Sequence, residues 1–266
     1  MRKILIGLLF LLLFISSCKD KGWQPIDTIL LDGIAPIGIA FWNDEIWLSD
    51  GDNNRMVVID ESGKILREIG PIERPMHIIT RNEKMYVPSY GTDEVLIFGE
   101  ASLDTLRPGI ELEGPGGIDI HGDFVAIADF YNHRVITYNG SEWNIIGGKG
   151  KDEGEFNYPT DLNIANDKIW VADAYNNRIQ VFDMDGNFEM SFGEDEKMNA
   201  ATGIYVDDSD VYVTDFENSR VFQYDQEGTM VAEINTGLNK PTDVIINKGE
   251  MWILNYGGKY ISRYTN

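Results

Sequence analysis

The sequence predicts an all-β protein, a six-bladed β-propeller, and two observations carry this prediction. The first is an internal repeat with a period of about 40 residues, which indicates a repeat architecture. The second is the content of each repeat, in which short apolar stretches alternate with turn residues, as expected for units of four strands. The chain of 266 residues is long enough for one large domain of this kind.

A short motif, Asp-x-x-Asn-x-Arg, defines the repeat. It occurs four times, as DGDNNR, DFYNHR, DAYNNR and DFENSR, beginning at Asp50, Asp129, Asp173 and Asp215. A marker residue lies 14 positions before each of these aspartates, and two weaker copies of the unit fill the remaining intervals. The six markers, 39 to 44 residues apart, are Pro36, Pro75, Pro115, Pro159, Ala201 and Pro241. Each unit is therefore expected to be one supersecondary element packed against the next.

The first strand of each unit begins at the marker. Apolar residues recur at every second position in this segment, on one face, which predicts a strand. The third residue after the marker is apolar in every unit. These residues are Ile39, Ile78, Ile118, Leu162, Ile204 and Val244. After a turn comes a second strand that is apolar on both faces, such as IWVAD, as expected for a sheet between two others. A third strand and a short fourth strand complete the unit.

Large aromatic residues occupy one column of the second strand in five of the six units. They are Trp47, Tyr86, Trp170, Tyr212 and Trp252. Because the same position is aromatic in nearly every repeat, we interpret the column as core between neighbouring sheets and not as a ligand cage.

The two ends of the repeat array predict how the ring closes. The last repeat ends with KYISRYTN and lacks a fourth strand, whereas the segment IDTILLDGI precedes the first repeat without a unit of its own. We therefore expect the N-terminal segment to supply the missing strand and to close the last blade. The propeller is assigned to residues 25–266.

The first residues have the features of a secretion signal. Arg2 and Lys3 precede an apolar run from Ile4 to Ile15, and ISSC follows. This ending resembles the lipobox of bacterial lipoproteins, so residues 1–17 are predicted to be a lipoprotein signal peptide. Cys18, the only cysteine of the chain, is then the lipidated residue, and residues 18–24 are the lipid anchor and a short linker. An ordinary signal peptide that contains a cysteine is the alternative.

The lipid predicts a location, and the charge predicts which partners are excluded. A lipid anchor on Cys18 implies attachment to a membrane of the cell envelope of a Gram-negative bacterium, in the outer membrane, facing the periplasm or the cell surface. The chain has 22 basic and 44 acidic side chains, a formal charge of −22, and removal of residues 1–17 makes this about −24. Such a charge repels phosphate backbones, so a nucleic-acid partner is not expected.

The segment PTDLNIANDKIWVADAYNNRIQVFDMDGNFEMSFG, from Pro159 to Gly193, resembles an NHL repeat, and the likeness extends over all six units. The resemblance implies an NHL-type propeller. Zinc lyases with a similar six-bladed propeller hold their metal through histidines at the positions directly after the markers, so that activity is not expected here. In this chain those positions hold Ile37, Met76, Gly116, Thr160, Thr202 and Thr242. Gluconolactonase-like propellers, which hold calcium through acidic and amide side chains, remain an open alternative, although no diagnostic stretch for them is present.

Four arginines close the repeated motif: Arg55, Arg134, Arg178 and Arg220. Each is expected to pair with the aspartate of its own turn, because the Asp, Asn and Gly residues of the motif suit a tight turn. A structural role is the main interpretation and ligand binding is the alternative. The turns join strands two and three, so they lie on the face of the ring where the first strands begin, which we call the top face.

The second position after the marker departs from the repeat in a regular way. It holds Gly38, His77, Gly117, Asp161, Gly203 and Asp243. The three polar residues fall on blades two, four and six, so they are expected to meet near the axis at the mouth of the central channel. One imidazole and two carboxylates suit a divalent metal such as calcium or zinc. The alternative is that these side chains are hydrated separately or cap nearby turns.

Two functions follow from these features. The first is a non-enzymatic binding or scaffold module for a protein, peptide, glycan or small ligand. The second is a metal-dependent lyase or hydrolase with its site at the channel mouth. Convergence of His77, Asp161 and Asp243 within about 5 Å of a common point would favour the second. A broad top face with exposed aromatic or charged patches and no convergence would favour the first. No residue is assigned as catalytic, since no nucleophile motif is present.

Overall fold

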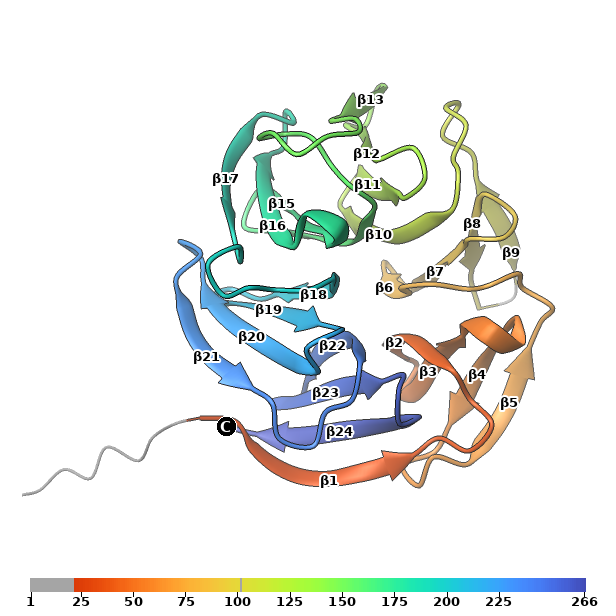
Figure 1. Ribbon diagram of the computed structural model, residues 1–266. Coiled ribbons are helices and arrows are strands. Elements are labelled where there is room, and N and C mark those ends of the chain that lie inside the picture. Colours follow the sequence, from red (N-terminus) through yellow and green to blue (C-terminus); the bar gives the residue numbers. More distant parts are fainter. Residues whose placement is uncertain (1–21, 101) are drawn as a thin grey trace, which may run out of the picture.

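The computed structural model describes residues 22–100 and 102–266, which form six four-stranded antiparallel sheets arranged in a ring (Figure 1). The prediction of an all-β, six-bladed propeller is therefore confirmed. The predicted signal peptide and the lipidated Cys18 lie outside the described residues. None of the helices in the described ranges is long and apolar enough to cross a membrane.

Each of the first five blades consists of four consecutive strands. The marker is the first residue of the inner strand except in blade two, where Pro75 forms an isolated bridge with Ser89 before the strand begins. Blade one contains β2 (Pro36–Trp42), β3 (Glu45–Asp50), β4 (Arg55–Ile59) and β5 (Ile65–Ile69). Blade two contains β6 (Ile79–Arg81), β7 (Lys84–Ser89), β8 (Glu94–Phe98) and β9 (Leu103–Leu106). Blade three contains β10 (Pro115–His121), β11 (Phe124–Asp129), β12 (Arg134–Tyr138) and β13 (Trp143–Ile146).

The remaining blades continue the same order. Blade four contains β14 (Pro159–Ala165), β15 (Lys168–Asp173), β16 (Arg178–Asp183) and β17 (Phe188–Phe192). Blade five contains β18 (Ala201–Val206), β19 (Asp210–Asp215), β20 (Arg220–Asp225) and β21 (Met230–Ile234). Blade six contains β22 (Pro241–Asn247), β23 (Glu250–Asn255), β24 (Tyr260–Thr265) and β1 (Gln24–Leu30). Two short 3-10 helices, η1 (Gly51–Asn53) and η2 (Ala174–Asn176), lie in the turns after β3 and β15.

The ring closes through strand β1, as predicted. This strand comes from the N-terminal end of the described chain and pairs antiparallel with β24, so that Leu30 lies opposite Tyr260 and Gln24 opposite Thr265. Figure 1 shows β1 as the outer strand of the last blade. Closure gives the outer edge of β24 a hydrogen-bonding partner.

The hydrophobic core lies between neighbouring blades. Six apolar clusters each combine side chains of two adjacent sheets, and every aromatic residue of the predicted column belongs to the cluster shared with the following blade. All five rings are buried. The interpretation of this column as core is therefore confirmed, and the blades are held at fixed positions around the axis.

Candidate functional site

Glycines and polar residues alternate around the axis, and the glycines allow the inner strands to approach closely. A Cβ atom at Gly38, Gly117 or Gly203 would lie 2.8 to 2.9 Å from the Cα atom of the polar residue in the following blade. Real Cβ atoms do not approach that closely, so these three positions require glycine. The space on the axis is left to the other three blades, which contribute His77, Asp161 and Asp243.

These three side chains, here called the channel triad, converge. One potential ligand atom from each of His77, Asp161 and Asp243 lies within 4.8 Å of the others. The Nδ1 atom of His77 is 3.7 Å from Oδ2 of Asp161 and 3.8 Å from Oδ2 of Asp243. The residues come from blades two, four and six, and each is less than a tenth exposed.

The backbone orients both carboxylates. A register shift follows the marker in β14 and in β22, just before the aspartate, and such a bulge re-aims the side chain that follows it. Oδ2 of Asp161 then accepts a hydrogen bond from the N–H of Ile204 in the next blade (3.0 Å). Oδ2 of Asp243 accepts one from Ile39 (2.9 Å). The two carboxylates are thus held in position by neighbouring inner strands.

His77 lacks the partners that the aspartates have. Its Nδ1 atom is buried and has no hydrogen-bond partner among the described residues, because both carboxylate oxygens are beyond hydrogen-bond distance. A buried polar atom without a partner is costly, typically by about 1–3 kcal/mol. The gap between the nitrogen and the two oxygens is therefore a place where an additional atom would be stabilising.

Burial and mutual charge shift the protonation of the channel triad. Burial by itself lowers the pKa of His77, but the charges of Asp161 and Asp243 outweigh it and raise this pKa to about 9. Burial raises the pKa of Asp161 to about 7, against the opposing effect of His77 and with a further contribution from Asp243. The site thus retains protons near neutral pH, and a bound cation would have to displace them.

The donor set fits a divalent cation. Bonds of 2.0 to 2.6 Å to such an ion place two ligands at most about 5 Å apart, a limit that the channel triad meets. Carboxylate oxygens suit calcium, magnesium and manganese, while imidazole also suits zinc. Three protein ligands would leave further coordination positions for water or for a ligand.

The channel triad lies at one end of a small cavity. The cavity has a volume of about 80 Å³ and runs from the triad past Ala40 and Ile79 to Arg81. The prediction placed the site at the channel mouth, whereas the structure places the three side chains inside the channel. Near the top face, hydroxyl groups of Thr160, Thr202 and Thr242 donate hydrogen bonds to the marker carbonyl of the next blade, which holds the strands together there.

A second polar group, further along the channel, was not predicted. The guanidinium Nε of Arg81 lies 3.0 Å from Oδ1 of Asp119, which is fully buried. Asp119 also accepts hydrogen bonds from the backbone N–H groups of Ile120 and Ile164 and from the side chain of Asn163. Burial raises the pKa of Asp119, although Arg81 opposes this shift. The signal in the sequence was the fourth position after the marker, where Asp119 and Asn163 replace apolar residues of other blades.

The four motif arginines all pair with the aspartate of their own turn. The distances from Nε to the carboxylate are 2.7 Å for Arg55, Arg134 and Arg220 and 2.9 Å for Arg178. The fifth residue of each turn, such as Asn54 or Asn177, has a positive φ of 54° to 59°. The second carboxylate oxygen accepts a backbone N–H from the incoming loop, at 2.7 or 2.8 Å. These contacts support a structural role for the arginines.

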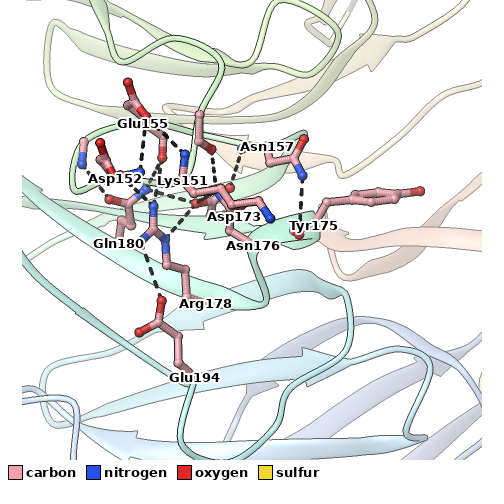
Figure 2. A network of polar contacts seen from close by, with 12 residues as sticks. Lys151, Asp152, Glu155, Asn157, Asp173, Tyr175, Asn176, Arg178, Gln180 and Glu194 are labelled. Atoms are coloured by element: carbon pink, nitrogen blue, oxygen red, sulfur yellow. Dashed lines mark hydrogen bonds and ion pairs between the residues drawn. The ribbon is translucent and has the colours of Figure 1, made fainter.

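The most extensive of these turns surrounds Arg178 (Figure 2). Arg178 is buried, pairs with Asp173 and donates hydrogen bonds to the carbonyl oxygens of Asp152 and Glu155. Gln180 donates to the same Glu155 carbonyl and to Asp173. The glycine-rich connection between blades three and four is therefore fastened to blade four by this network.

The fold and the axial cluster define a six-bladed β-propeller with a candidate cation site in its channel. Residues 146–259 match the family DUF5128, described as a 6-bladed beta-propeller. No curated protein matches the sequence.

Several solved structures share the fold at low sequence identity. A streptogramin B lyase is 17% identical with a TM-score of 0.69, covering 90% of this chain and 86% of its own. A gluconolactonase from Xanthomonas campestris is 13% identical with a TM-score of 0.71, covering 91% and 98%. A protein of unknown function from Bacteroides thetaiotaomicron is 16% identical with a TM-score of 0.69, covering 92% and 72%. Similarity at this level shows the propeller fold alone.

Proposed function

We propose that this protein is a lipid-anchored binding module of the cell envelope that holds a divalent cation in its channel through His77, Asp161 and Asp243. The observation that carries the cation site is the convergence of these three side chains around an unpartnered His77 Nδ1 atom. This convergence by itself favours the enzyme, and the choice of a binding module rests on the small volume of the cavity beside the site. A cation would accept the lone pair of this nitrogen and neutralise the two buried carboxylates, which removes both unfavourable features at once.

The size of the cavity supports a binding role for the site. A volume of about 80 Å³ is well below the roughly 300–1,000 Å³ of typical small-molecule pockets, so only a small group of a ligand fits beside the cation. The cation would then fix three blades relative to one another and anchor such a group. The ligand itself is a protein, a peptide, a glycan or a small molecule of which one polar group enters the channel.

The alternative is a metal-dependent lyase or hydrolase that uses the same three ligands. It is favoured by the number of protein ligands, because three ligands with open positions are typical of catalytic zinc sites. Two similar structures are named as a lyase and a gluconolactonase, which shows that this fold accommodates enzymes. Both proposals require the cation, so the metal is tested first.

The remaining parts of the proposal concern location. The leader sequence and Cys18 support a lipoprotein attached to a Gram-negative envelope membrane, and the repeats support an NHL-type propeller. Labelling with a fatty-acid analogue tests the anchor. Incorporation should be lost in a Cys18→Ala variant, and labelling of that variant would contradict lipidation at this residue.

The test of the cation site is metal analysis by mass spectrometry, after incubation with calcium, manganese or zinc and removal of free ions. The wild type should retain close to one metal ion per chain, and the His77→Ala and Asp161→Asn variants should retain none. His121→Ala is the matched control, because His121 is exposed at the end of β10. Binding should also release protons, measurable by calorimetry in buffers of different ionisation enthalpy, since the ligands must lose their protons.

Absence of retained metal in the wild type for all three ions would sink the proposal. Thermal unfolding of each variant separates loss of metal from loss of fold. If the metal is present, screening of the loaded protein against lactones and esters distinguishes the two functions. Turnover that is lost in the His77→Ala variant would establish the enzyme.

A further inference from the structure

We infer that the top face carries a second site, an arc of five aromatic side chains that binds lysine or arginine side chains of a basic partner protein. The arc comprises Tyr90, Phe130, Tyr131, Tyr158 and Tyr175, and is referred to below as the aromatic arc. Four of the rings come from turns of blades two, three and four, and Tyr158 comes from the connection directly before β14. The site is separate from the channel triad, so the inference does not depend on the proposed cation.

The rings of the aromatic arc form a continuous series. Ring centroids are 5.3 Å apart for Tyr90 and Tyr131, 5.1 Å for Phe130 and Tyr131, 4.7 Å for Phe130 and Tyr158, and 5.0 Å for Tyr158 and Tyr175. Tyr131 is 46% exposed and Tyr175 is 61% exposed. Figure 2 shows Tyr175 extending away from the polar network around Arg178. A contiguous exposed aromatic surface of this kind is typical of interaction sites.

The central ring is held in place. The backbone N–H of Tyr158 donates a hydrogen bond to Nδ1 of His133 at 3.1 Å, and the two rings are 4.2 Å apart. Burial, together with the charge of Lys149, lowers the pKa of His133, which keeps this nitrogen free to accept the bond. The centre of the arc is therefore held by contacts within the chain, so a partner does not have to order Tyr158.

The repeat itself shows that these aromatic residues are not needed for the fold. Each turn begins at the residue that aligns with the motif aspartate. Tyr90 and Phe130 lie one residue after it, and Tyr131 and Tyr175 lie two residues after it. In the other three blades the same two positions hold Gly51 and Asp52, Phe216 and Glu217, and Tyr256 and Gly257. Only blade three is aromatic at both positions and only blade one at neither, so the turns form with either kind of residue. Blades two to four differ from the others because the ring of Tyr158 joins their aromatic side chains into one series.

Two rings on this face already bind cations of the same chain. The guanidinium of Arg74 lies 5.3 Å from the ring centroid of Tyr90, and the ammonium of Lys240 lies 5.1 Å from that of Phe216. Within the described residues, no cation lies over Tyr131, Tyr158 or Tyr175. The ring of Tyr158 packs against Phe130 and His133, so the exposed rings of Tyr131 and Tyr175 are the ones with faces available for a cation from outside.

The charge of the molecule specifies the sign of the partner. The chain carries a formal charge of −22, and exposed carboxylates of Glu73 and Glu113 lie in the loops whose carbonyls bind the turns at Gly91 and Tyr131. An acidic partner would be repelled, and a neutral one would gain nothing from this field. A basic segment gains both long-range attraction and cation–π contacts on the aromatic arc.

The experiment compares a blocked tetra-arginine peptide with the same peptide made of citrulline, which keeps the shape of arginine and removes its charge. Binding to the purified protein is measured by calorimetry at physiological salt. A Tyr131→Leu and Tyr175→Leu double variant retains apolar area and net charge but loses the two π-systems. A Tyr131→Phe and Tyr175→Phe double variant retains them.

We expect the arginine peptide to bind the wild type and the phenylalanine variant equally, and the leucine variant roughly 5- to 30-fold more weakly. The citrulline peptide should bind all three weakly. The His121→Ala variant, which is changed at the far end of β10, should bind the arginine peptide like the wild type, and a loss as large as that of the leucine variant would contradict a site confined to the aromatic arc.

Two results would overturn the inference. Equal affinity of the wild type and the leucine variant for the arginine peptide would show that only net charge attracts it. Binding of a neutral oligosaccharide such as chitohexaose, lost in the leucine variant while the arginine peptide is unaffected, would assign the aromatic arc to glycans instead.

Discussion

At the scale of single residues, the geometry of the channel depends on the alternation of glycine and polar side chains. Gly117 faces Asp161 of the next blade, and a Cβ atom there would lie 2.8 Å from the Asp161 Cα atom. The strands can approach only because the side chain is absent. The three glycines of the inner strands are therefore as necessary for the site as its three polar side chains, because they leave the space in which those side chains meet.

A Gly117→Ala substitution should destabilise the protein by about 1–3 kcal/mol, because the added methyl group forces two inner strands apart. Gly148→Ala is the matched control, since nothing lies within 4 Å of its Cβ position and its expected cost is below about 0.5 kcal/mol. Urea unfolding measures both. The Gly117 variant should also retain less metal. Equal stability of the two variants would mean that the strands have room to adjust.

At the scale of structural elements, the turn between strands two and three does more than reverse the chain. Its aspartate pairs with the arginine of the motif and also accepts an N–H group from the loop that arrives from the previous blade. The arginine donates to carbonyl groups of that same loop. The motif thus fastens the incoming connection in each of the four blades that carry it, which explains its recurrence without reference to a ligand.

Replacement of Arg178 by lysine should cost about 2–4 kcal/mol, because lysine retains the charge but not the planar set of donors that reaches Asp173 and the loop carbonyls. Arg55→Lys is the control. Arg55 is more exposed, with 22% side-chain accessibility against 5% for Arg178, and a loss of about 1 kcal/mol or less is expected there.

Thermal unfolding and limited proteolysis check this difference. The connection between Gly147 and Asn157 should be cleaved faster in the Arg178→Lys variant than in the Arg55→Lys variant, since it loses its fastening. Similar losses of stability in the two variants would show that burial of the arginine does not matter here.

At the scale of the whole molecule, stability depends on closure of the ring. The core is divided among interfaces between neighbouring blades, so an open array would leave two of these faces exposed. The interface between blades six and one includes Ile29 of β1 together with Leu48 and Leu254. The N-terminal strand therefore contributes to the contact between the first and last blades as well as to the sheet.

An Ile29→Ala substitution should lower the free energy of unfolding by about 2–4 kcal/mol through the cavity that it leaves. The control lies in the same strand: Ile26 is 44% exposed, so Ile26→Ala should change stability by less than about 0.5 kcal/mol. Denaturant unfolding measures both variants. Hydrogen exchange should show that β24 loses protection first in the Ile29 variant, and uniform loss over all blades would contradict a local role in closure.

Prediction from sequence succeeded where the repeat could be used for alignment. Six aligned units placed His77, Asp161 and Asp243 at one level of the ring, and threefold spacing then implied that they meet. The ion pair between Asp173 and Arg178 followed in the same way from the motif.

The sequence did not predict contacts that depend on how far along the channel axis a side chain lies or on the direction in which it points. The pair of Arg81 and Asp119 joins different columns of two blades, and its residues are 38 positions apart. The aromatic arc combines turn positions whose side-chain directions are set by left-handed residues such as His133 and Tyr158. Column alignment marks Asp119 as a departure from the repeat but does not identify its partner or the neighbours of the aromatic rings, because it compares equivalent positions and these contacts join positions that are not equivalent.

The sequence by itself determined the all-β class, the number of blades, the closing strand and the membership of the channel triad. All of these follow from periodicity, because identical units stacked around one axis place equivalent residues at equivalent positions. Only the tertiary structure decided that the triad is buried inside the channel, that His77 Nδ1 lacks a partner and that five aromatic rings form a continuous surface. These properties depend on distances of a few ångströms between atoms of different blades, which bulges, glycines and turn angles set and which periodicity does not encode.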